Sequence, residues 1–112
     1  MSKQYQVSIA PLAEQCLRDI ESYKCGTVGA HQAAIFVDNL LMESVAYIMQ
    51  DPERYRYNAF LSERGLLLRE RLDVEGEYRV LYDFDGNSIN ILLFISMKQD
   101  FGKTLYRYNI LK

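Results

Sequence analysis

The 112-residue sequence has no tryptophan, one histidine, two cysteines and two prolines. His31 has no cysteine or carboxylate at ligand spacing, and no second Cys/His pair accompanies Cys16 and Cys25, so no metal signature is present. Walker loops, glycine-rich dinucleotide turns, HExxH motifs and nucleophile elbows are also missing. We therefore expect no metal and no cofactor. Any catalytic site must be built from arginine, lysine, tyrosine and carboxylate groups.

Long apolar runs are missing too. No stretch approaches the ~18 apolar residues of a membrane span, and Met1–Gln4 lead into alternating residues rather than the apolar core of a secretory signal. These absences predict a cytoplasmic protein without a membrane partner, in which Cys16 and Cys25 stay reduced. The apolar and charged fractions are those of a globular protein, and the length suits a single domain over residues 1–112.

Charge of one sign is not dominant, since the formal net charge is −2. Residues 1–53 hold three Lys/Arg against seven Asp/Glu, whereas residues 54–112 hold ten against eight. The balance argues against a protein coated in basic residues for nucleic acid. It leaves room for a local basic groove in the second half of the chain.

Hydrophobic periodicity predicts the elements. Apolar and polar residues alternate as in half-buried strands, or recur every three or four positions as in amphipathic helices. The expected elements are a strand over 5–9, helices over 12–25 and 30–50, strands over 66–72, 78–84 and 89–96, and a short helix over 101–109. This β-α-α-β-β-β order predicts an α+β domain whose helical hairpin packs on one face of a mainly antiparallel four-stranded sheet. The strand over 89–96 is apolar on both faces, so we expect it at the centre.

Turn and cap residues set the expected boundaries. Gly26 is expected to cap the first helix in a left-handed conformation, and Pro52 to stop the second. Residues 73–77 and 85–87 are expected to form the turns between strands, the latter from a strong hairpin signal, Asp-Gly-Asn. The stretch after Pro52 is expected to lie over the core.

The later strands gather residue types that suit RNA cleavage by attack of the 2′-hydroxyl. Arg69 and Arg71 share one strand face because side chains alternate. Arg79 lies on the next strand, and hairpin pairing is expected to bring the three arginines together to bind phosphate oxygens. Lys98 follows the central strand, and Tyr106 beside such cations suits proton transfer. The same residues also fit solvated strand positions and a packed terminal helix, so spacing leaves both interpretations open.

Three stretches together resemble the RelE/ParE family of type II toxins. "LAEQCLRDIESY" is similar to the family's first helix, and "FVDNLLMESVAYIMQDPERY" to its second helix and following proline. "RERLDVEGEYRVLYDFDGNSINILLFISMKQD" resembles its arginine strand, YRVLY strand, turn and long apolar strand. The resemblance covers nearly the whole chain. It implies a compact toxin that a cognate antitoxin protein neutralises in a hetero-oligomer.

Two activities occur in this family. RelE-like members cleave mRNA in the ribosomal A site, and ParE-like members inhibit DNA gyrase without nuclease activity. The family's basic pair matches Arg69 and Arg71. Its strand arginine matches Arg79, and the tyrosine of its terminal helix matches Tyr106. The expected catalytic arginine beyond the last strand falls at Asp100. Lys98 or Lys103 can supply charge there but lacks arginine's planar fork.

Three functional interpretations therefore stay open. The first, which the matches at Arg69, Arg71, Arg79 and Tyr106 favour and which we expect from the sequence, is a ribosome-dependent mRNA endoribonuclease acting on ribosome and mRNA. Its catalytic residues would be Arg79, Tyr106 and Lys98, and Arg69, Arg71 and Lys103 would bind RNA phosphates. The second is a ParE-like DNA gyrase inhibitor, which the net negative charge and Asp100 favour. The third is an inactivated member that only binds its antitoxin.

An apolar patch on the helical hairpin is also predicted. Leu12, Ile35, Val45 and Met49 lie off the main apolar stripe. If exposed, they form a surface that a partner should cover; the alternative is a wide core-facing side on a small domain.

Overall fold

The computed structural model describes residues 5–73 and 77–110. In chain order its elements are β1 (Gln6–Ile9), α1 (Pro11–Val28), α2 (Ala30–Gln50), α3 (Ala59–Ser62), β2 (Arg69–Asp73), β3 (Tyr78–Phe84), β4 (Ser88–Ser96) and α4 (Phe101–Arg107). The predicted α+β order is confirmed, with α3 as an addition. The middle of the turn expected over 73–77 lies outside the described residues.

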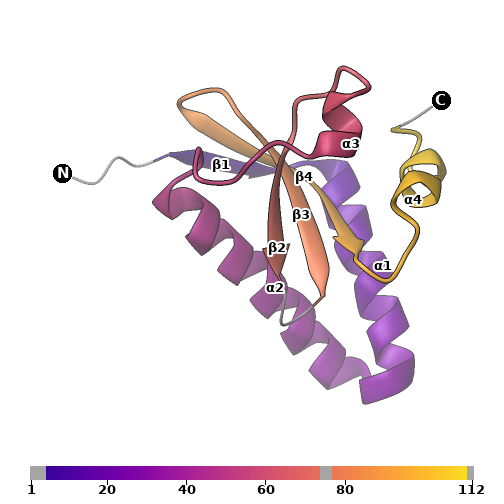
Figure 1. Cartoon of the computed structure of the whole chain (residues 1–112). Coiled ribbons are helices and arrows are strands. Elements are labelled where there is room, and N and C mark those ends of the chain that lie inside the picture. The colour runs from indigo at the N-terminus through magenta and orange to yellow at the C-terminus, as the bar shows by residue number, and fades with distance from the viewer. Residues whose placement is uncertain (1–4, 74–76, 111–112) are drawn as a thin grey trace.

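The strands form one sheet in the order β1-β4-β3-β2. β4 is central, as predicted: it pairs antiparallel with β3 and parallel with β1, while β2 pairs antiparallel with β3 at the edge. The α1–α2 hairpin runs along one side of the sheet, and the short helices α3 and α4 lie at the end of the molecule away from the bend between α1 and α2 (Figure 1). A register shift between Leu81 and Tyr82 interrupts the β3–β4 pairing.

A single residue, Gly29, joins the two long helices. Its φ of 88° is strained for residues with a side chain, and its backbone N–H donates to the Cys25 carbonyl at 3.0 Å. The expectation of a cap at Gly26 is wrong, because α1 continues to Val28 and Gly26 lies inside it. Either glycine could end a helix as far as the local sequence indicates, and it is Gly29 that adopts a positive φ when the two helices pack as a hairpin.

The sheet is apolar on both faces where β3 and β4 pair. Tyr78, Val80 and Tyr82 point to the same face and are buried, and Tyr82 donates its hydroxyl to the Pro52 carbonyl at 2.6 Å. Leu81 on the other face is equally buried. Apolar side chains on both faces of a strand require cover on both sides. The helical hairpin therefore covers only one of two apolar layers.

The helix α3 was missed from sequence because its four residues carry no periodic signal. Asn58 begins it: its side-chain oxygen accepts the Leu61 N–H at 2.9 Å, a typical helix N-cap. The Asn58 N–H in turn donates to the Leu68 carbonyl at 2.8 Å. This contact holds residue 68 against the α3 loop, and β2 begins at Arg69, later than predicted.

Candidate functional site

Arg71 lies on the sheet face that meets α2. It pairs in register with Val80, and its side chain is buried, with 8% of the residue exposed. Its guanidinium donates to the Ser44 hydroxyl at 3.2 Å and lies 4.7 Å from the centre of the Tyr47 ring. A guanidinium in such a place is held by its partners, since burying unpaired charge is costly. Arg71 therefore fastens the edge strand to the helix instead of projecting into solvent.

Arg69 projects to the same face and binds the segment that follows α2. Its Nη1 donates to the carbonyls of Glu53 and Tyr55 at 3.2 and 2.6 Å. Its guanidinium also stacks 4.5 Å from the Tyr57 ring centre. Four groups from one short segment thus converge on Arg69, including the Tyr57 hydroxyl at 3.4 Å. The arginine closes the loop over the sheet edge.

Arg79 points to the opposite face, because it pairs with Leu72 whereas Arg71 pairs with Val80. The expectation that hairpin pairing gathers the three arginines is wrong for this reason. Arg79 forms a 2.9 Å ion pair with Glu70, in which both side chains are largely shielded from solvent, 25% and 15% exposed. Its guanidinium lies 4.7 Å from the centre of the Phe101 ring.

The Arg79–Glu70 pair connects α3, β2, β3 and α4. Glu70 also accepts a hydrogen bond from the Asn58 amide, and Phe101 packs edge-on against Phe60 with ring centres 5.5 Å apart. The Nε of Arg79 is buried and has no hydrogen-bond partner among the described residues. This cluster holds the two short helices on the sheet face that the hairpin leaves uncovered.

α4 begins at the position where the family resemblance expects a catalytic arginine. Asp100 is the helix cap there: its carboxylate accepts the Lys103 N–H at 2.8 Å. Acidic caps are favoured at helix starts because they satisfy free N–H groups. Lys103 and Tyr106 are exposed, Tyr106 at 59%, while Leu105 is fully buried. The two predicted α4 residues thus face solvent.

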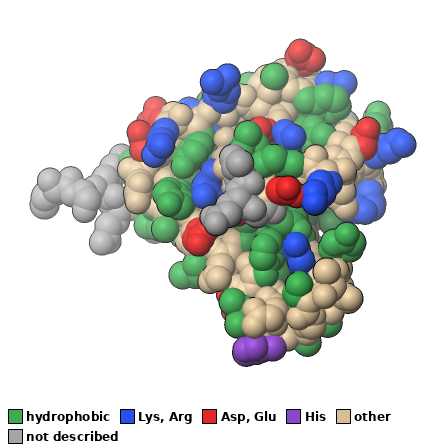
Figure 2. Space-filling view, turned by 60° about the horizontal axis from the view of Figure 1, so that its bottom comes forward, with side chains coloured by type: hydrophobic (Ala, Val, Ile, Leu, Met, Phe, Trp, Pro, Cys, Tyr) green, Lys and Arg blue, Asp and Glu red, His purple; other side chains and the backbone are tan. Residues whose placement is uncertain are grey.

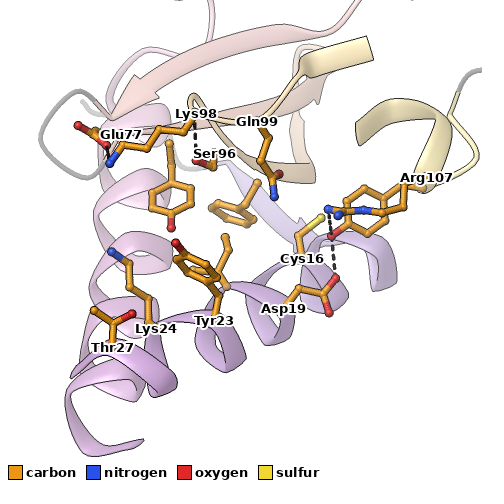
Figure 3. A pocket seen from close by; sticks show the side chains of 14 residues that line it. Cys16, Asp19, Tyr23, Lys24, Thr27, Glu77, Ser96, Lys98, Gln99 and Arg107 are labelled. Carbon is orange, nitrogen blue, oxygen red and sulfur yellow. Dashed lines mark hydrogen bonds and ion pairs between the residues drawn. The ribbon is translucent and has the colours of Figure 1, made fainter. Parts of the chain in front are cut away.

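The side chain of Lys98 lies on the other side of the sheet from Arg79. It forms a 2.9 Å ion pair with Glu77, and this hydrogen bond holds the pKa of Lys98 above its ordinary value. It lines a cavity beside α1 together with Tyr78 and Phe94, whose side chains belong to the hairpin face (Figure 3). The six predicted site residues are thus distributed over both faces of the sheet and the surface of α4.

Of the two alternatives for the four apolar residues off the main stripe of the hairpin, the core-facing one holds for three. Ile35 is exposed at 40%, whereas Leu12, Val45 and Met49 are half-buried against the core. The large apolar residues exposed on the two long helices are Tyr23, Val28, Ile35, Met42 and Tyr47. On the side seen in Figure 2, apolar side chains alternate with Lys and Arg, and no uniformly basic surface appears there. That side suits protein contacts better than a nucleic-acid backbone.

The part of the chain that the structure describes has neither a side-chain cluster for a metal ion nor a helix that could cross a membrane. Within residues 5–73 and 77–110, no group of three or more His, Cys, Asp or Glu side chains is arranged to hold a metal ion. Over the same residues, no helix combines the length and apolar character needed to cross a bilayer.

The architecture is a ParE/RelE-like fold, in which the described residues form four helices and a mostly antiparallel four-stranded sheet. A chain of the solved structure described as "Chromosomal ParDE TA system from P. aeruginosa" is similar, with a TM-score of 0.66 at 16% sequence identity. The match covers 85% of this chain and 98% of that one. No protein-family model and no curated protein matches the sequence. The likeness at this identity concerns the fold.

Proposed function

We propose that this chain is the toxin of a type II toxin–antitoxin module, and that it arrests growth by binding its target, with DNA gyrase as that target. The fold shared with a ParDE chain and the resemblance of three stretches to RelE/ParE toxins support the toxin assignment. A cognate antitoxin would cover exposed apolar residues of the hairpin such as Tyr23 and Met42, 75% and 65% exposed.

One observation favours binding over cleavage: the arginines that a nuclease would use are engaged within the molecule and divided between two faces. Phosphoryl transfer needs several donors converging on one phosphate. Arg71 is committed to Ser44 and Tyr47, and Arg79 to Glu70 and Phe101. Releasing Arg79 would leave Glu70 as an unpaired carboxylate in a poorly solvated place, which is costly.

A second candidate is ribosome-dependent mRNA cleavage, which one observation favours. Lys103 and Tyr106 are exposed on α4, the helix whose first residue, Phe101, stacks on Arg79. In this candidate Arg79 and Tyr106 act on the scissile phosphate with Lys98 in support, and Lys103, with Arg69 and Arg71, holds flanking phosphates. It requires Arg79 to exchange Glu70 for a phosphate when RNA binds.

Two reactions with the purified chain separate these candidates. In the first, gyrase relaxes or supercoils plasmid DNA in the presence of excess protein, and trapped cleavage complexes are measured. In the second, a reconstituted translation reaction receives the same protein, and message ends are mapped by primer extension. Gyrase inhibition with intact messages is the expected result. New ends within A-site codons with unimpaired gyrase would refute the binding mechanism.

Expression in cells tests the toxin assignment itself. Induction is expected to arrest growth, with filamentous cells and DNA damage if gyrase is the target, and the adjacent gene expressed together with the chain is expected to restore growth. Strong expression of correctly folded chain without a growth defect would contradict the toxin assignment and favour an inactivated member.

A further inference from the structure

A cavity of about 460 Å³ lies on the hairpin face of the sheet, away from the Arg79 cluster. Its walls come from α1, the ends of β3 and β4, and the C-terminal end of α4. Lys24, Glu77 and Lys98 lie toward one end, and Asp19 and Arg107 toward the other (Figure 3). The volume is within the range of small-molecule sites, roughly 300–1,000 Å³.

The two carboxylates that line the cavity are already satisfied. Glu77 is paired with Lys98 at 2.9 Å. Asp19 accepts the Tyr108 hydroxyl at 2.7 Å and the Gln15 amide at 2.9 Å, and the first of these bonds is the main reason that the pKa of Asp19 lies below its ordinary value. Glu77 is therefore occupied by Lys98, whereas Asp19 keeps its negative charge, and the nearby Arg107 also helps to lower its pKa. The lining as a whole holds three cations against two carboxylates, which leaves a small excess of positive charge.

Two of those cations have aromatic rings as their neighbours. Lys24 Nζ lies 4.6 Å from the centre of the Phe36 ring, and the Arg107 guanidinium lies 5.0 Å from that of Tyr108. Among the described residues, neither has a carboxylate within 4.0 Å. The cavity thus carries an excess of positive charge that a bound anion can neutralise.

Between its ends the cavity is aromatic. The rings of Tyr23, Tyr78 and Phe94 contribute to its lining, with Ser96 and Gln99 as uncharged hydrogen-bonding groups. Burial raises the pKa of Tyr78, so its hydroxyl stays protonated and can donate. Aromatic faces stack on planar heterocycles, and amide and hydroxyl groups read their edges.

We propose that this cavity binds a mononucleotide, with its phosphates at the end formed by Lys24 and Lys98 and its base among the aromatic rings. A planar ring joined to an anionic group matches both halves of the lining. A cavity of this volume fits one nucleotide and not an extended strand of nucleic acid. The site lies on the opposite face of the sheet from Arg79, and nucleotide binding can be measured without gyrase or ribosomes.

Titration of the purified chain with nucleotides tests this site. Isothermal calorimetry would compare ATP, GTP and AMP with adenosine and inorganic phosphate. The variants are Lys24→Gln, Lys98→Gln and their combination, and the matched control is Arg56→Gln, which removes an exposed charge outside the cavity. Circular dichroism and melting temperature confirm that each variant is folded.

The expected result is saturable binding of nucleotides, tighter than that of adenosine or phosphate alone. Each single variant should weaken it about tenfold or more, since a charge-assisted hydrogen bond is lost, and Arg56→Gln should bind as the unchanged chain does. No saturable binding at millimolar nucleotide, or equal binding by the folded double variant, would overturn the proposal. Binding of the acidic peptide Glu-Trp-Glu in place of nucleotides would overturn it in favour of a peptide site.

Discussion

Replacing Glu70 by alanine tests whether the Arg79 cluster holds the second face of the molecule together. Glu70 accepts hydrogen bonds from Arg79 at 2.9 Å and from the Asn58 amide, and only 15% of its side chain is exposed. Each hydrogen bond to a charged group contributes about 1.5–3 kcal/mol. Because Arg79 keeps some contact with water, we expect a net loss of about 2–3 kcal/mol in the free energy of unfolding. For a domain of this size, that corresponds to a fall in melting temperature of roughly 10 °C.

Urea denaturation followed by circular dichroism measures this loss. The matched control is Glu63→Ala, because Glu63 lies 4.0 Å from Arg64 with 77% of its side chain exposed, and such pairs contribute about 0–1 kcal/mol. Adding Arg79→Met to Glu70→Ala should recover part of the loss, since no guanidinium is then left unpaired. A Glu70→Ala variant within about 0.5 kcal/mol of the unchanged chain would refute the assigned role of the cluster.

Three further predictions concern the hairpin, a buried tyrosine and the cysteines. Gly29 has a positive φ, so Gly29→Ala should destabilise the chain by about 1 kcal/mol or more, whereas Gly26→Ala, inside α1, should stabilise it by about 0.5–1 kcal/mol. Urea denaturation that ranks the two variants in the reverse order would contradict a helix end at Gly29. Burial raises the pKa of Tyr82 above its ordinary value of 10.0, so the stability that the neutral Tyr82 hydroxyl contributes is complete below pH 10 and is lost at higher pH. Tyr82→Phe should therefore reduce the alkaline loss of stability, measured by denaturation between pH 8 and 11. A pH profile equal to that of the unchanged chain would show that Tyr82 does not cause the loss. Cys25 is exposed and should react with a thiol reagent at once, whereas Cys16, which is buried and has its pKa raised by burial, should react only when the chain unfolds. Mass spectrometry of the labelled chain counts the modified cysteines. Rapid labelling of both cysteines would contradict the packing of α1.

The elements with a long and regular pattern could be predicted from sequence. β3 was predicted over its observed range, Tyr78–Phe84, because alternation is uninterrupted there and a hairpin turn follows it. The end of α2 at Gln50 follows from the proline two residues later. α3 could not be found in this way, because a four-residue helix is defined by one cap and by its contacts with distant strands.

The candidate site was predictable in residue type but not in arrangement. Odd-numbered residues of β2 pair with even-numbered residues of β3, so Arg71 and Arg79 face opposite ways. A shift of one residue in this register would have put them together, and the turn that sets the register carries no local signal of that choice. Arg71 also appears as a surface residue in sequence, because Ser44 and Tyr47 are 27 and 24 positions away and only the fold brings them near.

The pairing of β1 with β4 has a consequence for the order in which the chain folds. Ser8 and Asn90 are parallel partners, and their side chains are hydrogen-bonded across a separation of 82 residues. Contacts between residues so far apart form late, because closing a long loop costs chain entropy first. During synthesis, β1 therefore remains without its partner strand until β4 has also left the ribosome, and the four-stranded sheet cannot be complete before that point.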